Sequence, residues 1–295
     1  MSAGLGLVGS RGFIGRELVK LVEQHADVEL RLAISQRDGK TPSEVAASKL
    51  DAYVLALPNG TSHAYVEAIA SARPDAVIVD LSADHRFDAS WVYGQPERNR
   101  AAISHAKRIA NPGCYATAMQ LALVPLVPLL EGPAHLFGVS GYSGAGTTPS
   151  PKNDPEALRD NVMPYSLVGH VHEREVATQL GCRLFFVPHV APFFQGVTVT
   201  VSVALSPPTT RDALAARYHA AYDAEPQVRF QEAIPLVRDI VGRHDVVLGG
   251  LAVSADLRHA VVVATIDNLL GGAATQALRN LNLALGFPEN QGVPS

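Results

Sequence analysis

The sequence predicts an α/β protein in which a domain built on a parallel β-sheet is joined to a second, α+β domain. Up to residue 113, short apolar runs alternate with segments of helical periodicity, which is typical of parallel strands connected by crossover helices. From about Leu136 onward, the apolar segments are longer and β-rich, and fewer helical patterns separate them. A second domain of the α+β class is therefore expected to begin after Cys114.

Five buried strands are expected in the first part of the chain, at residues 5–8, 28–34, 52–57, 76–81 and 108–110. A helix is expected between the first two, because apolar residues recur there at helical spacing, at Ile14, Leu18, Leu21 and Val22. In the second part, strands are expected at residues 184–187, 197–205 and 260–266. Residues 271–285 have the periodicity of a helix, which could pack against either domain.

The composition argues against several classes of partner. Acidic residues outnumber basic ones by 28 to 24, and no lysine- or arginine-rich run is present, so nucleic acid is not an expected partner. Neither a signal peptide nor a membrane span is expected, because the most apolar stretch, residues 121–130, is short and contains two prolines. Two cysteines in 295 residues are typical of a reducing compartment. We therefore expect a cytoplasmic protein with a free thiol.

A glycine-rich turn follows the first expected strand, and a helical pattern starts directly after it. Glycines let backbone N–H groups approach a pyrophosphate, and the dipole and free amides of a helix N-terminus favour its negative charge. A merely tight turn is the alternative, but the flanking strand and helix favour a Rossmann-type dinucleotide site. The residues expected to contact the cofactor are Gly9, Ser10, Arg11, Gly12, Phe13 and Ile14.

The end of the second expected strand indicates which cofactor binds. NAD-selective sites usually place an acidic residue there to bind the ribose 2′-hydroxyl, whereas this chain has Ser35 and Arg37. A hydroxyl and a guanidinium suit a 2′-phosphate, because arginine can grip phosphate with two parallel hydrogen bonds. The pattern predicts NADPH rather than NADH. Arg37 could instead be a solvated loop charge, and nearby Asp38 weakens the preference for NADPH.

Cys114 lies between an expected strand and a helical run, after the turn Asn111-Pro112-Gly113. A position near a helix N-terminus stabilises the thiolate, and the turn places the side chain at the carboxyl edge of the sheet, where ligands bind. We therefore predict that Cys114 is a nucleophile, although a small buried cysteine is the more common case. Cys182 has no such setting and is expected to be structural.

A thiolate that attacks an acyl group needs a partner to move protons, and histidine titrates nearest to neutral pH. His170 and His172, in the run Gly169-His170-Val171-His172-Glu173-Arg174-Glu175, are the densest candidates. They could also bind a metal, but no cysteine or third histidine stands at the spacing that a zinc site requires, so no metal is expected. Taken singly, His63, His85 and His189 are expected to be structural.

Two further segments have the character of ligand-binding loops. Residues 140–148 consist almost entirely of small residues, which cannot form a core, so we expect a loop that faces a ligand rather than a flexible surface connection. Arg86 follows the carboxyl end of an expected strand and could hold a phosphate or carboxylate. Otherwise it would form a surface ion pair.

Several motifs together resemble the N-acetyl-γ-glutamyl-phosphate reductases of arginine biosynthesis, within the larger aspartate-semialdehyde dehydrogenase superfamily. They are Ala110-Asn111-Pro112-Gly113-Cys114-Tyr115, Asp80-Leu81-Ser82-Ala83-Asp84, Tyr93-Gly94-Gln95-Pro96-Glu97, Val187-Pro188-His189-Val190, Gly141-Tyr142-Ser143-Gly144-Ala145-Gly146-Thr147, Pro149-Ser150-Pro151-Lys152-Asn153-Asp154, the run from His170 to Glu175, and Asp267-Asn268-Leu269-Leu270-Gly271-Gly272-Ala273-Ala274. The resemblance extends over almost the whole chain. Only the segment between Ile34 and Ala52 departs, being shorter than in many bacterial members.

The resemblance implies NADPH-dependent reduction of an acyl phosphate to an aldehyde through a thioester on Cys114, with His172 or His170 as the acid and base. It implies a Rossmann-type NADP-binding domain at residues 1–113 and 267–295, a catalytic and oligomerisation domain at 114–266, and a dimer or tetramer. Further cofactor contacts are expected from Ser143, Gly144, Asn268 and Gly272, and substrate contacts from Arg86, Asn111, Lys152 and Arg174. The alternatives are a related reductase of aspartyl or aminoadipyl phosphate, or an NADP-sensing protein without catalysis.

Overall fold

The computed structural model describes residues 2–294 and divides the chain into two compact units. The first unit contains the chain up to Gly113 together with the chain from Ala273 onward, and the second unit is Cys114–Gly272. No helix within residues 2–294 has both the length and the apolar character that crossing a membrane requires.

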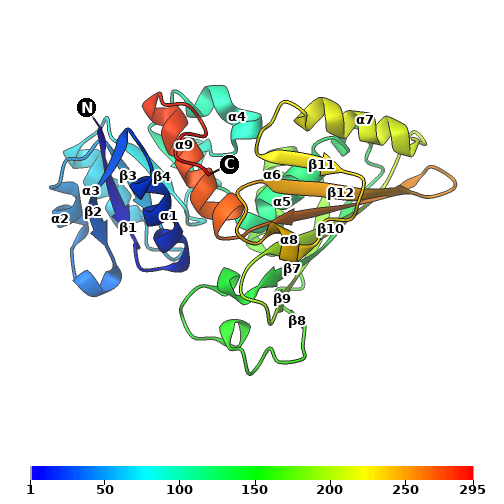
Figure 1. Cartoon of the computed structure of the whole chain (residues 1–295), viewed down its shortest axis with the longest axis horizontal. Coiled ribbons are helices and arrows are strands. Elements are labelled where there is room, and N and C mark those ends of the chain that lie inside the picture. The colour runs from blue at the N-terminus through cyan, green and yellow to red at the C-terminus, as the bar shows by residue number, and fades with distance from the viewer. Residues whose placement is uncertain (1, 295) are drawn as a thin grey trace. The chain divides into compact units, whose positions relative to one another are not determined.

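The first unit is built on a six-stranded sheet of order β2-β1-β3-β4-β6-β5, in which all neighbouring pairs are parallel (Figure 1). The strands are β1 (Ala3–Val8), β2 (Val28–Ile34), β3 (Ala52–Leu55), β4 (Val77–Asp80), β5 (Val92–Tyr93) and β6 (Arg108–Ala110). The five expected strands are confirmed, with small differences at their ends, but β2 lies at the edge of the sheet and is buried only at Val28 and Ile34, so the expectation that it is a buried strand is wrong. The two-residue β5 was not predicted, because so short a strand leaves no periodicity in the sequence.

Helices cover both faces of this sheet. On one face, α1 (Phe13–Glu23) and α9 (Thr275–Leu285) bury Leu18, Leu278 and Leu281 against β1, β3 and β4. On the other face, α2 (Pro42–Ala46) and α3 (His63–Ala72) enclose a second apolar cluster around Tyr53. Burial on both faces explains why β1, β3 and β4 are almost continuously apolar in sequence. The C-terminal helix, whose periodicity fits either domain, thus belongs to the first unit, and α4 (Pro96–Ile103) packs beside it.

The strand order reverses at β1, which lies between β2 and β3. In open parallel sheets, ligands bind outside the carboxyl ends of the strands at such a switch point. The glycine turn after β1 and the loop after β3 therefore lie where a ligand is expected. The crossover from β2 to β3 is short and contains only a 3-10 turn, η1 (Gln36–Asp38), and the five-residue α2.

The second unit is built on a seven-stranded mixed sheet of order β11-β12-β13-β10-β7-β9-β8. Its strands are β7 (Ala134–Gly141), β8 (Met163–Pro164), β9 (Leu184–Ala191), β10 (Val197–Ala204), β11 (Val228–Gln231), β12 (Val246–Val253) and β13 (His259–Ile266). The three strands expected in this half are confirmed, and β9 continues four residues further than expected, to Ala191. The predicted combination of a Rossmann-type parallel sheet with an α+β unit is thereby confirmed.

Helices α5 (Cys114–Leu123), α6 (Val171–Leu180) and α7 (Arg211–Tyr222) pack on one face of this sheet (Figure 1). Every residue of α5 after Cys114 is buried, so the first turn of this helix is fixed in the core. Along β10, buried residues alternate with partly exposed ones, as expected of a sheet that is covered on one face only. A short helix, α8 (Val237–Ile240), contacts β13.

Candidate functional site

The turn between β1 and α1 brings backbone atoms very close together. Gly9 has φ = +96°, and a Cβ atom there would overlap the carbonyl oxygen of Ala56. A Cβ at Gly15 would overlap the carbonyl oxygen of Gly9 in the same way. At Gly12, by contrast, the nearest atom to an added Cβ is 3.5 Å away, so the fold itself would tolerate a side chain. Glycine at this position keeps the space above the turn open for a ligand.

The N-terminus of α1 is suited to an anion. Its N-cap residue is Gly12, no side chain caps the helix, and no acidic residue lies in its first turn. The helix dipole and the amides of the first turn therefore favour negative charge supplied from outside the chain. The six residues expected to hold the cofactor, from Gly9 to Ile14, lie together here.

A polar cluster occupies the end of β2. Asp38 accepts hydrogen bonds from the backbone N–H of Ser35 (2.6 Å) and from its hydroxyl (2.8 Å), and these bonds hold the pKa of Asp38 below its ordinary value. The guanidinium of Arg11 lies 3.2 Å from the same carboxylate. Arg37 is exposed on η1. The structure thus joins Ser35 to Asp38 and Arg11, while the charge of Arg37 remains open to solvent.

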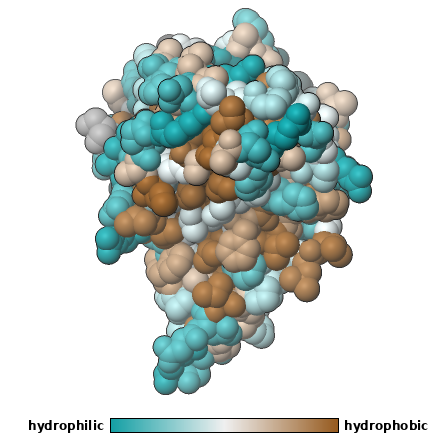
Figure 2. Space-filling view, turned by 90° about the vertical axis from the view of Figure 1, so that its right-hand side faces the viewer, coloured by the Kyte–Doolittle hydropathy of each residue, from teal (hydrophilic) through white to brown (hydrophobic). Residues whose placement is uncertain are grey.

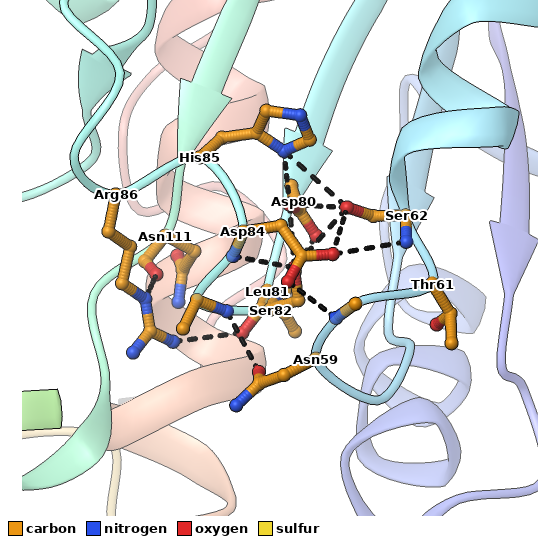
Figure 3. Close-up of polar contacts among 12 residues, drawn as sticks. Asn59, Thr61, Ser62, Asp80, Leu81, Ser82, Asp84, His85, Arg86 and Asn111 are labelled. Atoms are coloured by element: carbon orange, nitrogen blue, oxygen red, sulfur yellow. Dashed lines mark hydrogen bonds and ion pairs between the residues drawn. The ribbon is translucent and has the colours of Figure 1, made fainter.

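The loops after β3 and β4 are tied to each other (Figure 3). Asp84 accepts hydrogen bonds from the backbone N–H groups of Gly60 (2.6 Å) and Ser62 (3.2 Å) and from the Ser62 hydroxyl (2.8 Å). Burial raises the pKa of Asp84, but the bonds from Gly60 and Ser62 outweigh it, and the net pKa is lowered. The Ala83 N–H donates to Asn59 Oδ1 (2.9 Å). The exposed turn at residues 58–61 is therefore held rigidly at the carboxyl edge of the sheet.

A serine, a histidine and an aspartate meet beneath this turn (Figure 3). His85 Nδ1 lies 2.6 Å from the fully buried Asp80 and 3.5 Å from the Ser62 hydroxyl, which itself donates to Asp80 (3.1 Å). A nucleophilic triad uses both ring nitrogens of the histidine, one for each partner, whereas here a single nitrogen meets both. His85 also stacks on Trp91 at 4.0 Å. This network holds the loops together and has no nucleophile.

Two of the residues expected to bind substrate hold the backbone in the structure. Arg86 is only 8% exposed, and its guanidinium donates to the carbonyls of Leu81 (2.9 Å) and Asn111 (2.9 Å). The side-chain oxygen of Asn111 accepts from Asn280 Nδ2 (2.9 Å), on α9. Both residues therefore fix the segment that leads into the Asn-Pro-Gly turn. Their predicted contact with substrate stays a prediction.

Cys114 is the first residue of α5, as the sequence predicts for a thiolate stabilised by a helix N-terminus. It is half-buried, and a Cβ atom added to Gly272 would lie 2.7 Å from its own Cβ. Gly272 belongs to a π-helical turn (Leu270–Ala274), an irregularity frequent at functional sites. Burial, and then the charge of the Cys114 thiolate, raise the pKa of the Tyr165 phenol. The Tyr165 phenol therefore stays protonated at neutral pH.

His170 and His172 lie at the start of α6, which packs against α5. The His170 Nδ1 accepts a hydrogen bond from the His172 N–H (3.2 Å) and so caps the helix, which leaves its proton on Nε2. The two imidazole centroids are 4.8 Å apart, and that of His172 lies 6.0 Å from the ring of Tyr115. The structure therefore brings both histidines to the residue that follows Cys114.

Burial, and then the positive charge of Lys152, lower the pKa of His170 to about 4. His170 is therefore neutral at pH 7. Since this pKa is depressed relative to about 6.5 in the unfolded chain, the neutral imidazole contributes stability above pH 6.5 that is lost as the pH falls toward 4.

We expect the His170 ring to titrate near pH 4 in an NMR titration. Lys152→Met should raise its pKa, because a nearby positive charge that opposes protonation is removed. Since burial is the larger cause, the pKa of the variant should remain below about 6.5. An unchanged pKa in the variant would contradict this placement of the ammonium group.

Lys152 and Tyr165 complete the surroundings of the histidines. Lys152 lies on a short 3-10 turn, η4 (Pro151–Asn153), and its Nζ is 4.9 Å from the centroid of the Tyr165 ring. The Tyr165 ring is in turn 5.7 Å from that of His170. Tyr165 was not predicted, because it follows the two-residue strand β8 and no local pattern marks it. Arg174, two residues after His172, is exposed.

A buried pair, Asp267 and Asn268, joins the remaining predicted cofactor residues. The Asn268 amide donates to the Ser143 hydroxyl (2.9 Å) and accepts from the Gly196 N–H (2.7 Å). A Cβ at Gly144 would lie 3.8 Å from the same amide, so Ser143, Gly144 and Asn268 form one cluster. Asp267, fully buried, accepts from Gln195 Nε2 (2.7 Å). Neither Gln195 nor Asp267 was predicted, because their pairing links positions 72 residues apart.

Among residues 2–294, no group of three or more histidine, cysteine, aspartate or glutamate side chains is placed to hold a metal ion. The groups that the structure offers for chemistry are a thiol, two imidazoles, two phenols and an ammonium in the second unit, and a glycine turn for an anion in the first.

Comparison with known proteins identifies the family. The model described as "Semialdehyde dehydrogenase, NAD binding domain" matches residues 4–106, and that described as "Semialdehyde dehydrogenase, dimerisation domain" matches residues 114–268. The N-acetyl-gamma-glutamyl-phosphate reductase of Stenotrophomonas maltophilia is 49% identical, over 98% of both chains. That of Xanthomonas oryzae pv. oryzae is also 49% identical, over 97% of this chain and 96% of the relative.

Two solved structures share the fold at low identity. Aspartate semialdehyde dehydrogenase II from Vibrio cholerae, complexed with ASA, superposes with a TM-score of 0.78 at 17% identity, over 97% of this chain and 99% of that chain. The enzyme from Francisella tularensis gives 0.75 at 17% identity, over 95% and 99%. The resemblance seen in the sequence motifs is thus confirmed. The chain belongs to the semialdehyde dehydrogenase family, within the group of N-acetyl-gamma-glutamyl-phosphate reductases.

Proposed function

We propose that the protein reduces N-acetyl-γ-glutamyl phosphate to N-acetylglutamate semialdehyde and phosphate, with NADPH as reductant and a thioester on Cys114 as intermediate. The observation that carries this proposal is the position of Cys114 at the start of α5, against which α6 packs with His170 and His172. Identity of 49% over nearly the whole length to reductases of that name supports the choice of substrate.

The first step is nucleophilic. The Cys114 thiolate, stabilised by the N-terminus of α5, attacks the acyl carbon, the carbon–sulfur bond forms, and the bond to the phosphate oxygen breaks as phosphate leaves with the electron pair. The Tyr115 and Tyr165 phenols stay protonated and do not compete with the thiolate as anions, because burial raises the pKa of both. The Tyr115 hydroxyl already donates to the His189 carbonyl (2.9 Å). The thioester divides one difficult reaction into two easier ones.

NADPH, when bound at the glycine turn, supplies the hydride that reduces the thioester carbonyl. We propose that His172 donates a proton to the oxygen of the reduced thioester. His172 then takes this proton back as the carbon–sulfur bond breaks, which forms the aldehyde and releases the Cys114 thiolate. His170 is less suited to this role, because its Nδ1 is engaged in capping α6 and its pKa of about 4 keeps it neutral.

We propose NADPH rather than NADH because the one acidic residue at the end of β2 is already satisfied. Asp38 accepts two hydrogen bonds from Ser35 and pairs with Arg11, which leaves Arg37 as the exposed charge for a 2′-phosphate. Arg37→Ala should lower the ratio of NADPH to NADH efficiency by about tenfold or more, the loss of one charge-assisted contact. Steady-state kinetics with both cofactors measure the ratio, and an unchanged value would refute the assignment.

The activity is tested in the reverse direction. Purified protein is given NADP, phosphate and N-acetylglutamate semialdehyde, and the appearance of NADPH is followed; aspartate and aminoadipate semialdehydes are tested in parallel. The proposed substrate should give the highest kcat/KM. A clear preference for another semialdehyde would support the related reductase instead, and the absence of any NADPH formation would support a sensing protein.

We further propose that the protein self-associates through the sheet of the second unit. Phe137 on β7 and Phe185 on the neighbouring β9 are 47% and 42% exposed, unusually high for large apolar side chains on adjacent strands. A broad apolar area is visible on the side of the molecule drawn in Figure 2. The family model that matches residues 114–268 is itself described as a dimerisation domain.

Phe137→Glu should convert an oligomer to monomers, because a carboxylate would have to be buried in the interface. Val168→Glu, which alters an 86% exposed side chain on the loop before α6, is the matched control. Analytical ultracentrifugation gives the masses. A wild-type monomer at micromolar concentration would rule out stable self-association.

The proposed compartment is the cytoplasm, since the chain has only two cysteines and the proposed chemistry requires the Cys114 thiol to stay reduced. Cell fractionation with an antibody to the protein would test this, and recovery outside the cytoplasmic fraction would contradict it.

A further inference from the structure

We propose that Asn280, on the C-terminal helix α9, is a positioning residue for the nucleophile. It acts through the side chain of Asn111 and fixes the turn at residues 111–113, which leads into Cys114. This inference rests on the proposed function, in which Cys114 is the nucleophile. It goes beyond that function because it assigns a role to a residue outside the groups expected to touch substrate or cofactor.

The Asn280 side chain is fully buried and held in one place. Its Nδ2 donates to the carbonyl of Gly94 (2.8 Å), directly after β5, and to Asn111 Oδ1 (2.9 Å). A Cβ atom at Gly94 would lie 2.4 Å from this nitrogen, so the glycine makes room for the amide. The preceding residue, Arg279, forms a buried ion pair with Glu97 on α4 (2.7 Å). Movement of α9 along α4 would break this pair, which fixes the height of Asn280.

Two backbone carbonyls fix the orientation of both amides. A carbonyl only accepts hydrogen bonds, so Gly94 requires the nitrogen of Asn280 to face it. The same nitrogen faces Asn111, which must present its oxygen, and the Asn111 Nδ2 is left to donate to the Pro112 carbonyl (3.2 Å). Reversal of either amide would bring two acceptors together. Asn280 thereby decides which end of the Asn111 amide meets the turn.

The turn depends on this bond because it has little else to fix its path. The main chain of Asn111 is held by Asp80, whose carbonyl accepts its N–H (2.8 Å), and by Arg86, which donates to its carbonyl (2.9 Å; Figure 3). The ring of Pro112 fixes its φ but leaves its ψ free, and Gly113 is conformationally permissive. The bond from the Asn111 amide to the Pro112 carbonyl fixes the plane of the Pro112–Gly113 peptide, and therefore this ψ.

Cys114 follows this turn directly and begins α5. A thiolate at a helix start is stabilised by the unpaired N–H groups of the first turn, and these face the sulfur only if the chain enters the helix along one path. Rotation of the Pro112–Gly113 peptide, immediately before Cys114, would change that path. Asn280 is therefore expected to increase the thiolate fraction of Cys114 through the turn.

Alkylation by iodoacetamide, without substrate or cofactor, tests this role. A Cys182→Ser background leaves Cys114 as the only thiol. Asn280→Leu keeps the approximate size and adds no charge, but it removes both hydrogen bonds. The midpoint of the alkylation rate against pH should rise by about one pH unit, toward the value of about 8.5 for a free cysteine. The alkylation rate at pH 7 and kcat should both fall several-fold.

Asn282→Leu is the matched control. Asn282 is also fully buried on α9, and its Nδ2 also donates to two carbonyls, those of Glu289 (3.0 Å) and Gln291 (2.8 Å). Its Oδ1 lies 3.0 Å from His25 Nε2. This variant loses at least as many bonds, but they hold the C-terminal segment and not the turn. Both variants should lower the melting temperature, whereas only Asn280→Leu should move the alkylation midpoint. An unchanged midpoint in Asn280→Leu, or equal shifts in both, would overturn the inference.

A double variant shows whether the effect passes through Asn111. Asn111→Ala removes the same link from the other side and should shift the midpoint at least as far. Adding Asn280→Leu to it should cause no further shift, and additive shifts would contradict this route. Failure of the proposed function would look different, because alkylation needs no substrate. Wild-type protein would then form no NADPH from N-acetylglutamate semialdehyde, while the midpoints would still decide the role of Asn280.

Discussion

Cys114→Ser is expected to lower the rate of acyl-phosphate reduction by about 10⁴-fold or more, the scale seen when a covalent nucleophile is removed. The N-terminus of α5 can stabilise a thiolate, whose unperturbed pKa is about 8.5, but a serine hydroxyl remains protonated in the same place. The side chain is nearly unchanged in size, so folding should be unaffected. NADPH should still bind, because the glycine turn after β1 belongs to the other unit.

Two measurements distinguish a loss of chemistry from a loss of NADPH binding. Initial rates with saturating NADPH report the chemistry, and quenching of intrinsic fluorescence by NADPH reports binding. Cys182→Ser is the control: Cys182 packs against the core of the second unit, and burial raises the pKa of its thiol, so it is a poor nucleophile. A Cys114→Ser rate within tenfold of wild type would exclude the thioester.

His172→Gln should lower kcat by about 10²- to 10⁴-fold, the usual contribution of a general acid or base. Glutamine preserves polarity and approximate size but cannot exchange a proton near neutral pH. The measurement is kcat in the reverse direction at saturating concentrations of all substrates.

His170→Asn provides the comparison, because asparagine is among the best N-cap residues and its side-chain oxygen can accept the bond from the His172 N–H. Its kcat should stay within about tenfold of wild type, because His170 is expected to orient the start of α6 and not to carry the proton. If His170→Asn lowered kcat more than His172→Gln, His170 would be the acid and base, and His172 would not.

The features that could be predicted from the sequence were those that depend on residues close together along the chain. The alternation of apolar runs and helical spacing was sufficient to predict the parallel sheet, because each βα unit buries both faces of its own strand. The glycines at positions 9 and 15 were recognisable because the turn they form is only a few residues long and no other residue fits it. Periodicity showed that residues 271–285 form a helix, but packing decided that α9 covers the first sheet.

By itself, then, the sequence determined the fold class, the anion-binding turn, and a cysteine set at a helix start with two histidines beyond it. Only the tertiary structure showed that Tyr165 contacts His170 and that Lys152 lies over the Tyr165 ring. The same is true of the hydrogen bonds from Gln195 to Asp267 and from Arg86 to a backbone carbonyl. The physical reason is that helical and strand patterns report one segment's own burial. Which side chains meet across a sheet edge depends instead on strand order and loop path, and these are set by the packing of the entire core.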